Sequence, residues 1–190
     1  MSLLFFDTET TGLPKDYKAP ASALANWPRM IQIAWLLTDN SGNEIKGAEY
    51  IIKPSGFTIP ESASRIHGIT TDIANRKGAE LFSVLNIFIE DLRYATTLIA
   101  HNISFDEKIV GAEFLRNGLT NHIESKPRKC TMTSSTQYCA IPGNYGYKWP
   151  KLEELYSKLF GSNFVGAHNA LADVQACAKC YFKLRQIGIM

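Results

Sequence analysis

Apolar residues in the first part of the chain fall into short runs bounded by turn-forming residues, which is the pattern of buried β-strands. One run, Leu3–Phe6, opens the chain, and a second, Met30–Thr38, follows a proline-containing loop over Thr11–Pro28. The turn cluster at 39–43 separates the second run from a third, Glu44–Lys53, so these two runs are predicted to form a hairpin. The first three strands are therefore expected to make an antiparallel meander.

Beyond these runs, apolar residues recur every three or four positions, which is the spacing of helices packed against a core. The clearest example is Glu80–Leu92, and a short β-prone run, Thr97–Ala100, follows it. Lys129–Met132 is predicted as a further strand, and helices are predicted at Pro60–Ile66, from Thr71, at Ser104–Asn117, at Leu152–Phe160 and at Ala170–Ile187. Strands first and then alternating strands and helices predict an α/β fold, with a mixed sheet flanked by helices.

The composition is that of an ordinary soluble protein, with 45% hydrophobic and 20% charged residues. A chain of 190 residues suits one domain with its own core, so we expect a single domain over 1–190. No run approaches the roughly 20 apolar residues of a membrane helix. Because Asp7 and Glu9 come too early for a secretory signal, a cytoplasmic location is expected.

The four cysteines include one pair, Cys177 and Cys180, in a C-x-x-C arrangement. Such a pair is found in zinc sites and redox motifs. Here it lies within a predicted helix, and no second pair has matching spacing. We therefore expect buried free thiols rather than a metal or redox site.

The net charge of +2 is too small to indicate a nucleic-acid partner by itself. Basic residues cluster at Lys126, Arg128 and Lys129 and at Lys148 and Lys151; either cluster could contact phosphates, but a solvated surface is the better explanation for any one of these residues. The segment between them carries four aromatic residues, Tyr138, Tyr145, Tyr147 and Trp149. A basic and aromatic segment suits the guidance of a single strand, but aromatic residues packed in a core have the same pattern. The sequence leaves both interpretations open.

Two carboxylates, Asp7 and Glu9, stand two residues apart directly after the first apolar run. Side chains alternate faces along a strand, so these two are predicted to point the same way. Like charges side by side are unfavourable unless a cation lies between them, and hard oxygen ligands suit Mg²⁺ or Mn²⁺. Taken alone, the pair is more typical of an acidic strand end that passes into a solvated turn.

Two further aspartates are predicted in the first turn of helices. Asp106 follows the short strand Thr97–Ala100, and Asp173 follows Asn169, which is a plausible N-cap. A carboxylate is favourable at a helix start because of the helix dipole, so each has a purely structural explanation. His168 lies in the loop just ahead of the last helix, where a histidine taken alone is more often a surface residue.

The five residues together change that interpretation, because four carboxylates at the ends of core elements can converge on one point. Four such negative charges would repel strongly without cations. Two divalent ions about 3.5–4 Å apart relieve the repulsion and clamp a phosphodiester for in-line attack by water. A histidine can take the proton of that water at neutral pH, and a loop position lets it move toward the substrate. The residues concerned are Asp7, Glu9, Asp106, Asp173 and His168.

With these residues in this order, the chain resembles the DEDDh 3′→5′ exonucleases. This group contains the proofreading subunits of bacterial replicative polymerases, ribonuclease T and the mammalian repair exonucleases. The motifs that carry the resemblance are Asp7-Thr8-Glu9-Thr10-Thr11-Gly12-Leu13, His101-Asn102-Ile103-Ser104-Phe105-Asp106 and His168-Asn169-Ala170-Leu171-Ala172-Asp173. A sister group has a tyrosine where this chain has Asn169, whereas His168 stands where the histidine group has its base. The resemblance spans Leu3 to about Leu184 and implies a ribonuclease-H-like fold with a five-stranded mixed sheet.

The resemblance implies metal-dependent removal of nucleoside monophosphates from a free 3′ end. Asp7, Glu9, Asp106 and Asp173 would then hold two Mg²⁺ or Mn²⁺ ions, with His168 as the general base. It also implies that the terminal nucleotide is contacted by a second set of residues, Thr8, Thr10, Leu13, His67, Asn102 and Phe105. For this second set a structural alternative remains, since Leu13 can pack the loop before Pro14 and Phe105 can belong to the core.

Single-stranded nucleic-acid 3′ ends are the expected partner, with DNA placed ahead of RNA. A polymerase is a second possible partner, because replicative members of the group act in proofreading. Those members carry an extra C-terminal segment, and the chain ends at Met190 just past the last predicted helix, which favours a free-standing exonuclease. A catalytically silent nucleic-acid-binding module on the same fold is the remaining alternative, and the intact set of site residues speaks against it.

Overall fold

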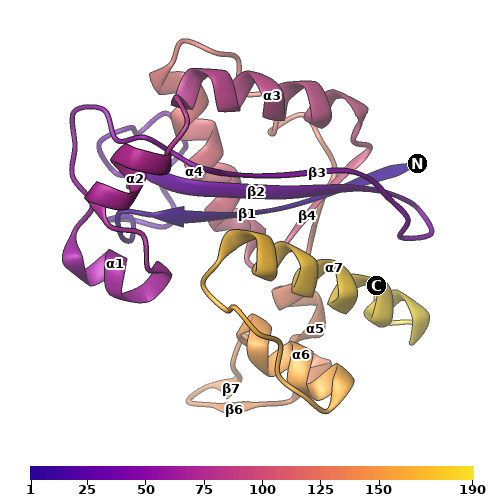
Figure 1. Ribbon diagram of the computed structural model, residues 1–190. Helices are drawn as coiled ribbons and strands as arrows, with labels where there is room; N and C mark the ends of the chain where they lie inside the picture. The colour runs from indigo at the N-terminus through magenta and orange to yellow at the C-terminus, as the bar shows by residue number, and fades with distance from the viewer.

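A five-stranded mixed sheet organises the chain, and the computed structural model describes residues 1–190 (Figure 1). Its strand order is β3-β2-β1-β4-β5. The strands β1 (Ser2–Thr10), β2 (Met30–Asp39) and β3 (Glu44–Ile51) form an antiparallel meander. The shorter β4 (Thr97–Ala100) and β5 (Arg128–Cys130) continue the sheet in parallel with β1. The predicted α/β fold with a mixed sheet is confirmed.

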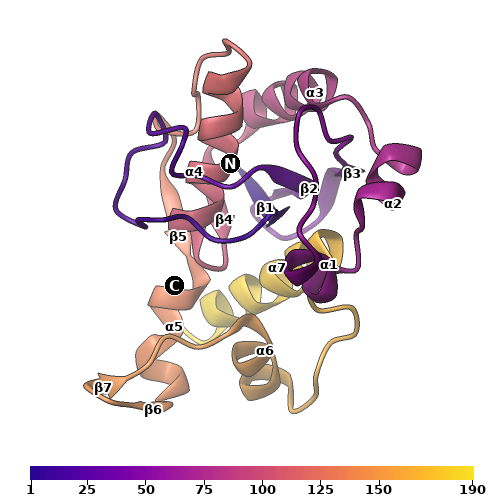
Figure 2. The ribbon, with the colours of Figure 1, turned by 90° about the vertical axis from the view of Figure 1, so that its left-hand side faces the viewer.

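Helices cover both faces of this sheet. Figure 1 shows α3 on one side and α7 on the other, while Figure 2 shows α4 on the same side as α3. The helices are α1 (Glu61–His67), α2 (Thr71–Lys77), α3 (Leu81–Tyr94), α4 (Ile103–Arg116), α5 (Thr131–Cys139), α6 (Leu152–Phe160) and α7 (Ala170–Gln186). A separate small hairpin consists of β6 (Pro142–Gly143) and β7 (Gly146–Tyr147).

The central strand β1 is buried on both of its faces, and this fixes which way its polar end points. Leu4 and Phe6 belong to the larger apolar cluster with α3 and α4, whereas Leu3 and Phe5 pack with α7. Burying each phenylalanine contributes roughly 1.5–3 kcal/mol. A slip of one residue would exchange the two sets of side chains, so the register is strongly specified.

The first strand continues past its apolar run to Thr10, so Asp7 and Glu9 lie at the end of the strand and on one face of it, as expected. One other strand boundary differs from the expectation, and two elements were missed. The predicted strand Lys129–Met132 is instead Arg128–Cys130, and Met132 lies in α5. Neither α5 nor the β6–β7 hairpin was predicted, because both consist mainly of polar or turn-forming residues.

The cysteines are free, and Cys177 and Cys180 face two different apolar clusters from one helix. Burial raises the pKa of Cys177 well above its ordinary value and that of Cys180 to about 12. Both thiols are therefore neutral core residues, as expected from their position in the last helix. No helix combines the length and the apolar character that a membrane span requires.

A buried ion-pair network attaches the loop between β1 and β2 to α4. Glu113 is fully buried, and its Oε1 atom accepts hydrogen bonds from Arg29 Nε and Arg116 Nη1, each at 2.9 Å. Arg116 Nη2 also donates to the backbone oxygens of Leu24 at 2.6 Å and Trp27 at 2.7 Å. One guanidinium thus satisfies a buried charge and two loop carbonyls at once.

We expect Arg116→Ala to lower the free energy of unfolding by about 3 kcal/mol, because it leaves a buried carboxylate without one of its cations. Urea denaturation would measure this. Arg65→Ala is the matched control, since Arg65 and Glu61 form an exposed pair along α1, and its effect should stay within about 0.5 kcal/mol. Equal effects of the two substitutions would contradict a structural role of the buried network.

Candidate active site

The last residues of β1 bring two carboxylates to one face of the sheet. Asp7 and Glu9 continue the side of the strand on which Leu3 and Phe5 pack against α7. Glu9 is paired with Gln32 of β2, and the register shifts directly after it, between Glu9 and Thr10. Such bulges often lie beside active sites, where they change the direction of neighbouring side chains.

The junction between β4 and α4 supplies the third carboxylate. Asp106 lies in the first turn of α4, is buried, and accepts hydrogen bonds from both Thr8 donors on the adjacent strand. The Oδ1 atom is 3.0 Å from Thr8 N and 2.8 Å from Thr8 Oγ1. The chain enters α4 through Asn102, which has a left-handed backbone with φ of 72°. Asparagine tolerates this conformation better than most residues do.

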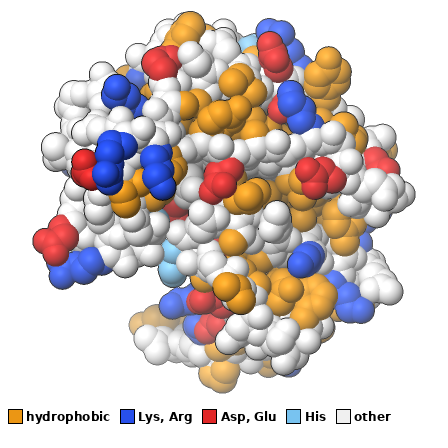
Figure 3. Space-filling view, viewed as in Figure 1, with side chains coloured by type: hydrophobic (Ala, Val, Ile, Leu, Met, Phe, Trp, Pro, Cys, Tyr) orange, Lys and Arg blue, Asp and Glu red, His pale blue; other side chains and the backbone are white.

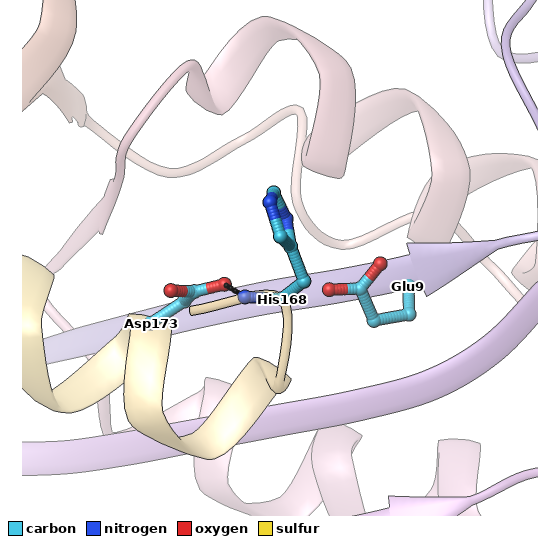
Figure 4. Close-up of side chains that lie close together, drawn as sticks. All are labelled: Glu9, His168 and Asp173. Carbon is cyan, nitrogen blue, oxygen red and sulfur yellow. Dashed lines mark hydrogen bonds between the residues drawn. The ribbon is translucent and has the colours of Figure 1, made fainter. Parts of the chain in front are cut away.

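The start of α7 supplies the fourth carboxylate and the histidine. Asn169 caps the helix by accepting a hydrogen bond from Ala172 N, as predicted. The amide of His168 donates to Asp173 Oδ2 at 3.1 Å (Figure 4). Figure 4 shows the carboxylates of Glu9 and Asp173 on either side of the His168 backbone, with the imidazole ring projecting away from the space between them. His168 is exposed and has a left-handed backbone with φ of 66°.

The side chains of Glu9, His168 and Asp173 each offer a ligand atom, and these atoms lie within 4.8 Å of one another. In the space-filling view a histidine is visible in a notch between the part of the molecule formed by α1 and α2 and the part formed by α6 (Figure 3). Because His168 is exposed and Glu9 and Asp173 are half-buried, the site is open to solvent.

The electrostatics of the four carboxyl groups show that they share one space. Burial and repulsion by Asp173 and Asp106 raise the pKa of Glu9 to about 8. Burial raises the pKa of Asp106 to about 7 against the opposing Thr8 hydrogen bonds, and burial raises that of Asp173 to about 6. Burial, with repulsion by Asp106, Asp173 and Glu9, also raises the pKa of Asp7 well above its ordinary value.

Four carboxylates that destabilise one another's charge fit the needs of divalent cations. Bound cations reverse the local electrostatics by favouring the ionised form of each group. The donor set is rich in hard oxygen atoms, with an imidazole beside it, and such sets suit Mg²⁺ and Mn²⁺. The structure therefore contains a carboxylate and histidine cluster that is suited to bind metal ions.

A hydrogen-bond network that the sequence did not reveal holds the His168 loop against the sheet. Glu49 Oε1 on β3 accepts hydrogen bonds from Gln32 Nε2 at 2.6 Å and from Asn169 Nδ2 at 3.0 Å. Gln32 Oε1 in turn accepts from Ala170 N at 3.3 Å. The network fixes the residues directly after His168 relative to the strand that carries Glu9. Isolated polar residues within strand patterns gave no signal for it.

The residues predicted to contact the terminal nucleotide differ in burial and in hydrogen bonding. Thr8 is committed to Asp106, and the hydroxyl of buried Thr10 donates to Gly12 O at 2.6 Å within a local turn. His67 lies near His168, and burial lowers its pKa against the opposing effect of a hydrogen bond with the Thr10 backbone. Its Nδ1 atom accepts a hydrogen bond from Ile69 N at 3.1 Å, and its Nε2 atom is buried. The ring therefore lies beside the end of β1.

An exposed apolar surface lies on the other side of the cluster. Leu13 is 74% exposed, so it does not pack the loop. Phe105, beside Asp106, packs partly against the core and contacts Tyr17, with ring centroids 6.5 Å apart. Tyr17 is itself 56% exposed and was not singled out in the sequence, because it lies in a loop without a recognisable motif. Tyr17 and Phe105 thus form an aromatic pair beside Asp106, and Leu13 is exposed shortly after the end of β1.

A mixed sheet with carboxylates at the end of β1 and in the first turns of α4 and α7 is the arrangement expected of a nuclease that hydrolyses phosphodiester bonds. The family assignment agrees with this class. The model of the exonuclease family RNase_T matches residues 4–181, and the chain belongs to this family.

Two individual proteins are similar to this chain over most of its length. The chain is 27% identical over 175 residues to the uncharacterized exonuclease CP81 of Escherichia phage 186, with 90% of this chain and 81% of the relative covered. It is 28% identical over 180 residues to the DNA polymerase III subunit epsilon of Treponema pallidum, with 93% and 73% covered.

Solved structures of exonuclease I have the same fold. The zinc-bound complex of Escherichia coli exonuclease I with single-stranded DNA superimposes with a TM-score of 0.74 at 25% identity. This superposition covers 99% of the present chain and 41% of the exonuclease I chain, so the protein spans less than half of that enzyme's length.

The raised carboxyl pKa values predict an unusual dependence of stability on pH. Folding raises the pKa of Glu9 to about 8 and of Asp106 to about 7, from ordinary values of 4.5 and 3.8. Their protonation therefore stabilises the fold fully below about pH 4, and this contribution is lost as the pH rises through those folded values. In EDTA, the Tm should fall between about pH 6.5 and 8.5, and Mg²⁺ should restore it most at the high end.

This pH window lies above the range in which His101 affects stability in the opposite direction. Burial lowers the pKa of His101 to about 4, so this residue makes the fold less stable as the pH falls. Thermal denaturation followed by circular dichroism would measure the effect. Asp106→Asn should flatten the dependence in EDTA by removing one of the titrating groups. A Tm that rises with pH across the window in the metal-free protein would contradict the prediction.

Substitutions of Glu49 should change turnover, although Glu49 does not contact the reacting groups. Glu49→Ala should lower kcat about tenfold, because the residues next to His168 lose an anchor, while Glu49→Gln keeps an acceptor oxygen and should retain most activity. Steady-state nuclease assays would separate the two variants. Comparable losses in both would show that the Glu49 charge, and not the anchoring of the loop, is what matters.

Proposed function

We propose that the protein is a 3′→5′ exonuclease that removes nucleoside monophosphates from single-stranded nucleic-acid ends, with DNA as the preferred substrate. The observation that carries this proposal is the convergence of Asp7, Glu9, Asp106 and Asp173, with raised carboxyl pKa values, beside His168. The single-stranded substrate is supported by the exonuclease I relative, whose structure was solved with single-stranded DNA. The 3′ direction is what the resemblance to the DEDDh group implies.

In this proposal Asp7, Glu9, Asp106 and Asp173 hold two Mg²⁺ or Mn²⁺ ions. Such ions, when bound, stabilise negative charge on the phosphoryl and leaving oxygens and make a water molecule more acidic. Asp106 is held for this task by Thr8, and Asp173 by the backbone amide of His168. Glu9 is fixed by its position at the bulge in β1.

His168 acts as the general base that takes the proton of the attacking water. Its ring projects from an exposed loop and is turned away from the gap between Glu9 and Asp173 (Figure 4). A small rotation of the side chain brings a ring nitrogen toward the gap, so the base can engage when the substrate is in place. The leaving 3′ oxygen of the shortened strand is protonated by solvent.

The terminal nucleotide lies between two groups of residues that flank the carboxylates. Leu13 and Phe105 contact the last bases with apolar surface, which favours unstacked single-stranded ends. Thr10, Asn102 and His67 supply polar groups for the sugar and its 3′ hydroxyl, with the His67 ring beside the backbone of Thr10. Thr8 contributes indirectly by fixing Asp106.

A role as the proofreading partner of a polymerase is the second candidate. It is favoured by the similarity to a DNA polymerase III subunit epsilon over 93% of this chain. Co-purification of a polymerase from the native cell would support it, whereas an isolated, fully active exonuclease would favour the free-standing enzyme.

The direct test compares three 5′-labelled substrates, which are single-stranded DNA, single-stranded RNA and a duplex with a 3′ mismatch. Each is incubated with Mg²⁺, with Mn²⁺ and with EDTA. A ladder that shortens from the 3′ end only with metal would support the proposal, and the rates would rank the substrates. Release of the 5′ label as a mononucleotide from the first time point would contradict the proposed direction.

His168→Asn should lower kcat by a factor of 10² to 10⁴, the usual contribution of a general base, and leave folding intact. Asparagine tolerates the left-handed backbone at this position and cannot take the proton. Asp7→Asn is the companion variant and should abolish metal-dependent cleavage. Full activity of His168→Asn would remove this residue from the mechanism, and unchanged cleavage by Asp7→Asn would contradict the proposed metal site.

A further inference from the structure

The small hairpin β6–β7 and the two residues after it expose three aromatic rings. Tyr145 is fully exposed, Trp149 is 65% exposed and Tyr147 is 50% exposed. These rings line a hollow of about 440 Å³ whose remaining walls come from the hairpin itself, at Gly143, Asn144, Gly146 and Lys148. A hollow of this size lies within the range of pockets that hold small ligands, roughly 300–1,000 Å³. These three aromatic residues are therefore not core residues, whereas Tyr138 packs against an apolar cluster with α6 and α7.

The base of the hairpin is attached directly to the motif that carries Asp106. His101 Nε2 lies 2.9 Å from the backbone oxygen of Pro150, the residue after Trp149. Its other nitrogen, Nδ1, lies 3.0 Å from Thr131 Oγ1 at the start of α5. Because burial lowers the pKa of His101 to about 4, the ring is neutral, so it donates to the carbonyl and accepts from the hydroxyl.

The contact through His101 fixes where the hairpin lies relative to the candidate active site. Asp106 lies five residues after His101 in the same motif, and Pro150, the carbonyl partner of His101, directly follows Trp149. In Figure 1 the hairpin lies at the bottom of the molecule beside α6, whereas α1 and the end of β1 lie on the left. Figure 2 has the end of β1 near the centre and the hairpin at the lower left. A strand that leaves the carboxylates would therefore reach the aromatic rings by passing the His101 motif.

The charge around the hairpin suits a polyanion. Residues 125–151 contain five lysines and arginines, of which Arg128 is paired with Glu107 at β5 and only Lys148 and Lys151 adjoin the hairpin. Lys148 and Lys151 flank Trp149 and Pro150. Lys148 is paired with Glu154 at 2.6 Å, so Lys151 is the flanking cation without a paired carboxylate. Nucleic-acid phosphates are attracted by such clusters, and the attraction depends on salt.

We propose that Tyr145, Tyr147 and Trp149 form a base-stacking platform for the single strand upstream of its 3′ end. This inference rests on the proposed exonuclease function and names the place where the rest of the substrate binds. Exposed aromatic rings next to cations are the usual means of holding single strands without sequence preference. A protein partner would also bury aromatic rings, but the concave hollow, the flanking lysines and the attachment to the Asp106 motif favour a nucleic-acid strand.

The platform predicts that affinity rises with strand length and that Trp149 carries a large share of the gain. Trp149→Ala should raise KM for a single strand of about 20 nucleotides by roughly fivefold to a hundredfold, the range for one lost base stack. It should leave kcat and the hydrolysis of a nitrophenyl ester of thymidine 5′-phosphate unchanged, because that substrate is too short to reach the hairpin. Trp149→Phe should restore most of the affinity.

Tyr94→Ala is the matched control, because Tyr94 is 72% exposed at the end of α3, near the start of β1 and far along the sheet from the carboxylates. It should leave KM unchanged for every substrate. Equal KM values for Trp149→Ala and the wild-type protein on the long strand would overturn the platform. The exposed rings would then be assigned to binding a protein partner.

A fluorescence measurement separates failure of the platform from failure of the exonuclease proposal. Trp149 is exposed, whereas Trp27 and Trp35 are 4% and 0% exposed. A change in tryptophan emission on addition of an oligonucleotide therefore comes almost entirely from Trp149. In the His168→Asn variant with Mg²⁺, we expect an oligothymidylate to quench the emission, and Trp149→Phe to abolish the quenching. Quenching without any cleavage by the wild-type protein would support the platform and contradict the exonuclease. Cleavage by the wild-type protein without quenching in the variant would support the exonuclease and contradict the platform.

Discussion

The burial of four carboxyl groups close to one another is the constraint around which the rest of this structure is arranged. Each of Asp7, Glu9, Asp106 and Asp173 has a pKa raised by burial, and they come from β1, α4 and α7. In the absence of cations, the scaffold has to supply the free energy that holds them together. It does so by placing the first two on a strand that is locked between two apolar layers.

The other two carboxylates are held by hydrogen bonds from neighbouring elements rather than by their own helices. Thr8 donates twice to Asp106, and the sheet residues Gln32 and Glu49 hold the loop beside Asp173. Glu113 and Arg116 do the same for the loop that carries Leu13 and Tyr17. The site is thus assembled by contacts between distant parts of the chain, and most of the neighbouring loops have a specific anchor.

The parts of the fold that the sequence predicted are those whose apolar residues repeat with a clear period. The runs behind β1, β2 and β4 and the stripe of α3 were read correctly because burial alone defines them. The helix α5 was missed because its sequence is rich in threonine and serine, which favour helices only weakly. It forms because Thr131, Met132, Ser135 and Cys139 are buried by tertiary contacts. The motifs located the carboxylates and His168, but the anchors Gln32, Glu49 and His101 depend on contacts across up to 138 residues of sequence, which no local pattern encodes.

The left-handed backbone at His168 sets the proposed chemistry of this residue against its backbone conformation. A residue with a Cβ atom in this region costs roughly 1–2 kcal/mol, and glycine or asparagine would relieve much of that cost. Selection for a stable fold alone would therefore tend to replace this histidine. A lineage that no longer needed the imidazole would gain stability by losing it, so the strained position serves as a sensitive indicator of whether a chain of this fold is still under selection for catalysis.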